Sequence, residues 1–231
     1  MTLYGNVTEV ASLIGDATRT SILMALLGGQ ALPAGELAKV ARVSPQTASN
    51  HLAKLVAGGL ITVEAWGRHR YYRLASPDVA KALESISSLS LPTPVHSLRQ
   101  SNEANAICFA RTCYDHIAGR FGVAFTDALL NKGYLAKRAD GYAVTPDGEQ
   151  YFVTLGIEER IIHKFSSSVP RHVDWTERVH HMAGPIALAV TTHLLELDWI
   201  RRGPVRRSIV VTTLGREKLE QELGLNVDDE R

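Results

Sequence analysis

The sequence predicts a mainly α-helical protein with small β-hairpins, divided into two domains. Three observations support this. Apolar residues recur at helical spacing through the first 60 residues. A Ser- and Pro-rich stretch lies at 87–94, and the remainder contains a two-fold internal similarity. We expect an N-terminal domain over 1–90, a linker over 91–99 and a mostly helical C-terminal domain over 100–231, which is consistent with a chain of 231 residues.

Composition excludes several classes of protein. Hydrophobic residues make up 45% and charged residues 21%, as in an ordinary globular protein rather than a disordered or collagen-like one. The formal net charge is only +1, so any attraction for nucleic acid must be local. Two cysteines cannot form a disulfide framework. With neither a signal peptide nor a run of about 20 apolar residues, we expect a soluble cytoplasmic protein without membrane contact.

The N-terminal domain reads as several helices followed by a hairpin. Ser44 is a good helix N-cap, and Pro45 suits the first helical position, where its missing N–H is not needed. The expected helices span 7–14, 18–27, 34–42 and 45–57, and the expected strands span 60–66 and 70–74. This order, with a turn at Gly67-Arg68, predicts a winged helix-turn-helix fold.

The helix at 45–57 has the composition of a DNA-reading helix. No acidic residue occurs between Ala38 and Thr62. Gln46 and Asn50 suit bidentate contact with adenine, and hydroxyls and lysine suit phosphate. Residues 36–75 hold six basic and two acidic side chains, although a solvated basic face would also explain this excess. The predicted DNA contacts are Ser44, Gln46, Thr47, Ser49, Asn50, His51 and Lys54 on the helix, and Arg68, His69 and Arg70 at the hairpin tip.

The first 90 residues resemble the ArsR family of bacterial repressors. The matching segments are Gly15-Asp16-Ala17-Thr18-Arg19, Ser44-Pro45-Gln46-Thr47-Ala48-Ser49-Asn50-His51-Leu52, Gly58-Gly59-Leu60-Ile61 and Gly67-Arg68-His69-Arg70-Tyr71-Tyr72. The resemblance implies a homodimer that binds double-stranded operator DNA, usually represses, and is released by an inducer. It also implies that helices near 7–14 and 77–89 form the dimer interface.

Two departures from that family concern metal sensing. Many members bind metals through a Cys pair on the helix before the DNA-reading helix, but this segment, 36–41, has no Cys. Others use Asp and His on the helix after the wing, but residues 76–84 have no His. Because soft-metal sensing needs thiolate or imidazole ligands, the two familiar metal sites are absent.

The C-terminal domain contains two similar units, at about 108–165 and 172–225. His116-Ile117-Ala118-Gly119 recurs as His181-Met182-Ala183-Gly184. Each unit is expected to be a long helix, a short hairpin and a closing helix capped by Thr145 or Thr212. The long helices are placed near 114–131 and 174–197, so Gly119 and Gly184 would interrupt them. Such glycines favour tight helix packing or the close approach of a ligand.

Polar residues cluster in both units and are the candidate effector site. They are Cys113, Asp115 and His116 in the first unit, and Glu177, His180 and His181 in the second. Glu177 and His181 are four residues apart, so on one helix they could chelate a cation, but solvated or hydrogen-bonded histidines are the favoured interpretation. A reactive thiol at Cys113 also stays open. With no HExxH or CxxC motif, no metal site and no cofactor are predicted.

An organic or reactive small molecule is the expected inducer, bound in an apolar cavity between the two long helices, unless that region is a filled core. The aromatic residues expected to line the cavity are Phe109, Tyr114, Phe121, Phe125, Trp175 and Trp199. The leading functional hypothesis is therefore a transcriptional repressor and not an enzyme. One alternative is a metal- or thiol-redox-sensing repressor. A less favoured one is a small-molecule methyltransferase with a winged helix, although no GxGxxG motif occurs.

Overall fold

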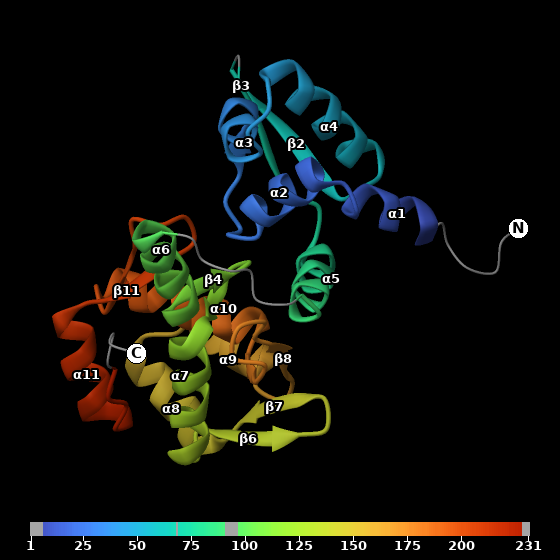
Figure 1. The fold of residues 1–231 in the computed structure, drawn as a ribbon. Helices are drawn as coiled ribbons and strands as arrows, with labels where there is room; N and C mark the ends of the chain where they lie inside the picture. The colour runs from blue at the N-terminus through green and yellow to red at the C-terminus, as the bar shows by residue number, and fades with distance from the viewer. Residues whose placement is uncertain (1–6, 68, 91–96, 228–231) are drawn as a thin grey trace, which may run out of the picture. The chain divides into compact units, whose positions relative to one another are not determined.

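The computed structural model describes residues 7–67, 69–90 and 97–227 (Figure 1). The chain forms two compact units, one ending at Leu83 and the other beginning at Glu84. The division falls inside helix α5 (Pro77–Ser88), and most of the linker expected at 91–99 lies outside the described residues. In the described part of the chain, no helix is both long enough and apolar enough to cross a membrane.

The first unit is a winged helix-turn-helix. Its elements are α1 (Val7–Ile14), α2 (Ala17–Leu26), β1 (Leu32–Pro33), α3 (Ala34–Val40), α4 (Pro45–Ala57), β2 (Ile61–Trp66) and β3 (His69–Leu74). The strands form an antiparallel sheet in the order β1-β3-β2. Helices α2, α3 and α4 pack together beside it, with Ile22, Leu37 and Leu52 fully buried. The bounds of α4 are those expected from the sequence, because Ser44 caps its start and Gly58 ends it.

The second unit is mixed α/β, so the expectation of a mostly helical domain was wrong in part. Its helices are α6 (Leu98–Phe109), α7 (Gly119–Asn131), α8 (Pro146–Leu155), α9 (Glu159–Phe165), α10 (Gly184–Glu196) and α11 (Thr213–Leu223). Its strands are β4 (Arg111–Cys113), β5 (His116–Ala118), β6 (Leu135–Arg138), β7 (Gly141–Val144), β8 (Val169–Val173), β9 (His180–Met182), β10 (Ile200–Arg202) and β11 (Ile209–Val211). They form the hairpins β4-β5 and β10-β11 and the four-stranded sheet β6-β7-β8-β9.

The two long helices begin later than the sequence suggested. Residues 114–118 and 174–183 are turns and strands, and α7 and α10 begin at Gly119 and Gly184. These glycines therefore start the helices rather than interrupt them. Both have a left-handed φ, 81° and 76°, which favours glycine. A Cβ on Gly119 would also lie 2.8 Å from the carbonyl oxygen of Cys108.

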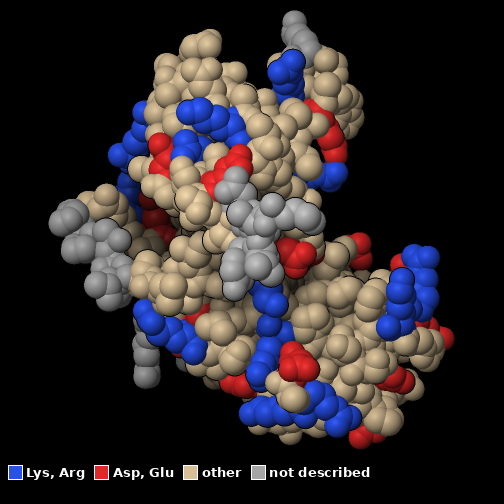
Figure 2. Space-filling model, turned by 90° about the vertical axis from the view of Figure 1, so that its right-hand side faces the viewer, with Lys and Arg blue, Asp and Glu red and all other residues tan. Residues whose placement is uncertain are grey.

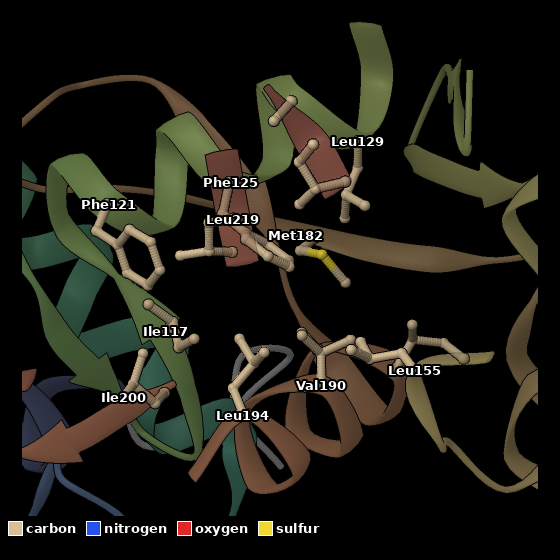
Figure 3. Packing of buried hydrophobic residues seen from close by; sticks show 14 of the residues in the cluster. Ile117, Phe121, Phe125, Leu129, Leu155, Met182, Val190, Leu194, Ile200 and Leu219 are labelled. Carbon is tan, nitrogen blue, oxygen red and sulfur yellow. The ribbon is translucent and has the colours of Figure 1, made fainter. Parts of the chain in front are cut away.

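The same order of elements occurs twice in this unit. Each half has a β-hairpin strand, a long helix, a second hairpin and a closing helix: β5-α7-β6-β7-α8, then β9-α10-β10-β11-α11. Thr145 and Thr212 cap the two closing helices by accepting hydrogen bonds from Gly148 and Gly215. In Figure 3 the side chains of Phe125 on α7 and Val190 on α10 point toward one another, and they belong to one continuous hydrophobic core.

Candidate functional site

Helix α4 presents a polar, cation-bearing face to solvent. Ala48, Leu52 and Leu55 are buried against the rest of the unit. The opposite face exposes its polar residues, which are Gln46, Thr47, Ser49, Asn50 and Lys54. This face therefore carries amide, hydroxyl and ammonium groups that are available to a ligand.

Three of the expected DNA contacts have structural partners. Ser44 Oγ accepts a hydrogen bond from the backbone N–H of Thr47 at 3.1 Å, and the two hydroxyls are 2.8 Å apart, yet both residues are exposed. His51 is half-buried, and its Nδ1 lies 3.5 Å from the carboxylate of Asp16. His51 therefore differs from its exposed neighbours on α4, because its imidazole lies beside Asp16, the N-cap residue of α2.

The hairpin β2-β3 forms the wing. His69 and Arg70 are exposed near its tip, whereas Arg68 lies outside the described residues. Sequence reasoning missed Trp66, which pairs with His69 and is 83% exposed. A large apolar side chain this exposed is unusual, and apolar side chains can insert into the minor groove of DNA.

Charge on the first unit is partly compensated. Arg73 forms an ion pair with Glu64 across the wing, so it adds little to the local positive field. On the face of the molecule drawn in Figure 2, basic and acidic side chains are interspersed. Lys54 on α4 and Arg70 on the wing are exposed basic side chains that can supply positive charge to a contact surface.

The second unit brings together one cysteine and three histidines. Strand pairing places Cys113 opposite His116 in β4-β5, and His172 opposite His181 in β8-β9. Cys113, His116 and His181 were expected from the sequence as effector residues, and His172 was not. We call these four residues the Cys-His quartet.

The quartet is compact and largely buried. Cys113, His116 and His181 are each 1% exposed, and the side chain of His172 is 18% exposed. The Sγ of Cys113 lies 3.6 Å from Nδ1 of His172, and the Nε2 atoms of His116 and His181 are 3.2 Å apart. One ligand-type atom each of Cys113, His116 and His172 lie within 4.8 Å of one another.

The other expected effector residues lie around the quartet or away from it. Asp115 contacts Nδ1 of His116 at 3.1 Å. Glu177 lies in the turn between β8 and β9, where its backbone N–H donates to Asp174. The helical spacing that would have let Glu177 and His181 chelate a cation does not occur, because His181 is in strand β9. His180 is half-buried and precedes His181 in β9. Its burial lowers the pKa of its imidazole, and the positive charge of Arg171 lowers it further.

Glu84 on helix α5 contacts the quartet directly. The Cys113 thiol donates a hydrogen bond to Glu84 Oε2 at 2.6 Å, and Glu84 lies 3.7 Å from the buried guanidinium of Arg207. Burial, and then the neighbouring Glu84 carboxylate, raises the pKa of Cys113 well above its ordinary value. The thiol is therefore held protonated, which disfavours an activated, nucleophilic cysteine.

A buried ion pair ties the two hairpins together. Arg111, two residues before Cys113, donates to Asp174, two residues after His172, at 2.8 Å. Both side chains are at most 1% exposed. Asp174 also accepts the backbone N–H of Gly119 at 2.6 Å. The pair therefore fixes the spacing of the strands that carry the quartet.

The cavity expected between the two long helices is almost filled. The space beside Phe125 and Val190 holds about 10 Å³, and Phe121 and Phe125 are core residues. A larger open groove of about 580 Å³ lies elsewhere in the unit, and Trp199 alone of the expected aromatic residues lines it. Its walls are Tyr134, Tyr151, Thr154, Leu155, Leu197, Trp199, Lys218 and Glu222.

Comparison with known proteins bears on both units. Residues 14–64 match a family model described as a helix-turn-helix domain. The chain is 42% identical over 223 residues to the HTH-type transcriptional regulator YdfF of Bacillus subtilis, covering 96% of this chain and 99% of that one. It is 37% identical over 78 residues to the HTH-type transcriptional regulator CmtR of Mycobacterium tuberculosis, covering 34% of this chain and 65% of that protein.

A solved structure is similar to part of the chain. It is the homodimeric winged helix-turn-helix domain of a possible ArsR-family regulator from Mycobacterium bovis, 26% identical over 37% of this chain and 86% of that domain, with a TM-score of 0.33. The YdfF match extends over nearly the whole chain, so the class of protein is a DNA-binding helix-turn-helix transcriptional regulator. The chain belongs to the ArsR family, in a form with a C-terminal extension.

Proposed function

We propose that this regulator is a homodimeric repressor that binds operator DNA through α4 and the wing, and that an effector bound by the second unit releases it. The observation that carries the proposal is the exposed face of α4, which bears amides, hydroxyls and Lys54 with no acidic residue on that helix. An acidic side chain there would repel phosphate, and a helix entering the major groove needs short polar side chains.

The proposed DNA contacts divide by chemistry into residues that contact bases and residues that contact phosphate. Gln46 and Asn50 carry amides that can bond the N6 and N7 edge of adenine, so they read bases. Ser49 and Lys54 hold phosphate and fix the register of the helix. On the wing, Arg70 supplies charge and Trp66 an apolar edge for the minor groove.

Dimer formation is supported by the exposed apolar side chains of α1. None of its residues is buried, and Val7 and Val10 are 69% and 40% exposed. A second copy of the chain would cover them, and a dimer reads two half-sites, which supplies the contacts that one winged helix lacks.

The methyltransferase alternative is not favoured. A nucleotide-type cofactor fold needs parallel strands joined by a Gly-rich turn and a helix. Between named strands in the part of the chain that the structure describes, every pairing is antiparallel.

The test is selection of binding sites from random-sequence duplex DNA with the full-length protein, followed by affinity measurements on the selected site and on point variants of it. The proposal predicts a selected sequence with two-fold symmetry. Gln46→Ala should lose about 1–3 kcal/mol of discrimination at one or two base pairs per half-site. The exposed Gln150→Ala on α8 is the matched control and should change nothing. Selection of no sequence, or equal loss from both variants, would overturn the proposal.

A further inference from the structure

The two halves of the second unit are related by an approximate two-fold axis, and paired hydrogen bonds show it. The backbone N–H of Ile117 donates to Thr191 at 3.1 Å, and the backbone N–H of Met182 donates to Thr126 at 3.0 Å. Ile117 and Met182 are 65 residues apart, as are Thr126 and Thr191, so each half makes the same bond to the other.

The Cys-His quartet lies between these two halves. His116 and His181 are equivalent residues, and their Nε2 atoms meet at 3.2 Å. Cys113 is paired with His116 as His172 is paired with His181. Each hairpin therefore supplies two ligand-type side chains. Ligand-type atoms of Cys113, His116 and His172 lie within 4.8 Å of one another, and His181 adjoins His116.

We propose that the quartet binds a thiophilic divalent cation of the Zn²⁺ class, with Cys113, His116 and His172 as ligands and His181 as the fourth. One thiolate and three imidazoles form a donor set of the kind that Zn²⁺ prefers. Tetrahedral bonds of about 2.0–2.3 Å place ligand atoms about 3.3–3.8 Å apart. The separations of 3.6 Å and 3.2 Å already approach that spacing.

The surroundings of His116 and His181 leave ring nitrogens available for a cation. Asp115 contacts Nδ1 of His116 at 3.1 Å, which leaves Nε2 for a cation, the usual arrangement of a carboxylate behind a metal-bound histidine. Nδ1 of His181 is buried and has no hydrogen-bond partner. That nitrogen or Nε2 of the same ring can therefore serve as a ligand atom without breaking a hydrogen bond to another residue's oxygen.

The site also has a route to the DNA-binding unit. A cation replaces the proton on Cys113, and the hydrogen bond from that thiol to Glu84 is lost. Glu84 would then face a metal-bound thiolate from its position on α5, the helix that continues back to Pro77 in the first unit. This regulatory consequence rests on the proposed function, whereas cation binding does not.

The test is titration of the reduced, EDTA-treated full-length protein with CoCl₂, followed by ZnCl₂. We expect one Co²⁺ per chain, a sulfur-to-cobalt charge-transfer band, the intense visible bands of four-coordinate Co²⁺, and displacement by Zn²⁺. Cys113→Ser should abolish the charge-transfer band, whereas Cys108→Ser, the matched cysteine control, should keep it. Because His172 is partly exposed, His172→Gln should fold, and it should weaken Co²⁺ binding at least about 100-fold. His163→Gln, at an exposed site on α9, should not weaken it.

Absence of the charge-transfer band in the wild type would overturn the proposal, as would its loss in Cys108→Ser alone. Equal affinity of wild type and His172→Gln would also overturn it. Should Cys113→Ser fail to fold by circular dichroism, the comparison of His172→Gln with His163→Gln decides. No DNA is present in these measurements, so a failure of operator binding leaves their outcome unaffected, and the converse also holds.

Discussion

Replacing Asp174 by Asn should destabilise the second unit strongly, because buried hydrogen bonds converge on this carboxylate. It accepts from Arg111 Nη2 at 2.8 Å, from the backbone N–H groups of Gly119, Thr176 and Glu177 at 2.6, 2.9 and 3.0 Å, and from the Thr176 hydroxyl at 2.6 Å. An amide keeps one acceptor oxygen but leaves the charge of Arg111 buried without a counter-ion.

The magnitude follows from that loss. Removing one partner of a buried ion pair costs about 3–5 kcal/mol. For a chain of this size, 1 kcal/mol lowers the melting temperature by about 2–4 °C, so Asp174→Asn should melt about 10 °C lower. Thermal unfolding by circular dichroism measures this, and Trp175, 4.6 Å from the Arg111 guanidinium, offers a local fluorescence signal.

The pH dependence of folding stability is an independent test of whether this ion pair stabilises the fold. Burial acts to raise the pKa of Asp174, but Arg111 and the hydrogen bonds from Thr176 and the backbone outweigh it and hold that pKa well below its usual range. The ion pair therefore stabilises the fold above the unfolded-state pKa of about 3.9, and that stability is lost as pH falls below it. Asp174→Asn should show a flatter stability curve in this acidic range.

The control for this prediction is Asp198→Asn, because Asp198 pairs with Arg201 in an exposed position. This variant should melt as the wild type does. A melting temperature of Asp174→Asn within about 2 °C of the wild type would refute the reasoning, because the network would then carry too little of the stability of the unit.

The remaining predictions concern DNA, assembly and signalling. Replacing Arg68 and Arg70 by Ala should weaken binding to specific and random DNA alike, and should reduce the slope of log K against log salt by up to about 0.9 per lost phosphate contact. Val10→Glu should convert the dimer to a monomer in light scattering, because it places a charge on the exposed face of α1. Glu84→Gln should retain the cobalt charge-transfer band at saturating Co²⁺ but lose the effect of the cation on DNA affinity.

Each of these predictions has a result that contradicts it. An unchanged salt slope would remove the wing from the DNA contacts. A Val10→Glu dimer would move the interface away from α1, and Val210→Glu, which charges a similarly exposed valine in β11, controls for a general effect of charge. A Glu84→Gln protein that still responds fully to Zn²⁺ would show that signalling does not pass through this carboxylate.

The first unit was predictable because its signals are local. Ser44 and Pro45 start α4 and Gly58 ends it, so the DNA-reading helix could be bounded to the residue. Strand β1 was missed because it has two residues, one of them proline, and carries no alternating pattern. The outward position of Trp66 depends on the register of the hairpin, which the sequence did not define.

The second unit was predictable in its repeat but not in its site. The 65-residue offset identified the equivalence of His116 and His181. The same offset places Arg178, not His172, opposite Cys113, because the turn between β8 and β9 is longer than the turn between β4 and β5. The three-residue strands β4 and β5 are also too short for an alternating pattern, so β4 was not predicted and β5 was read as part of a helix.

The most direct test of the account is the affinity of the full-length protein for its selected DNA site, measured by fluorescence anisotropy with and without saturating Zn²⁺. Allosteric coupling is typically about 5–150-fold, so we predict that Zn²⁺ weakens wild-type binding at least about fivefold. Cys113→Ser should bind DNA equally well in both conditions. Equal wild-type affinity with and without Zn²⁺, in protein whose cobalt spectrum shows that the quartet is occupied, would contradict the claim that this site controls DNA binding.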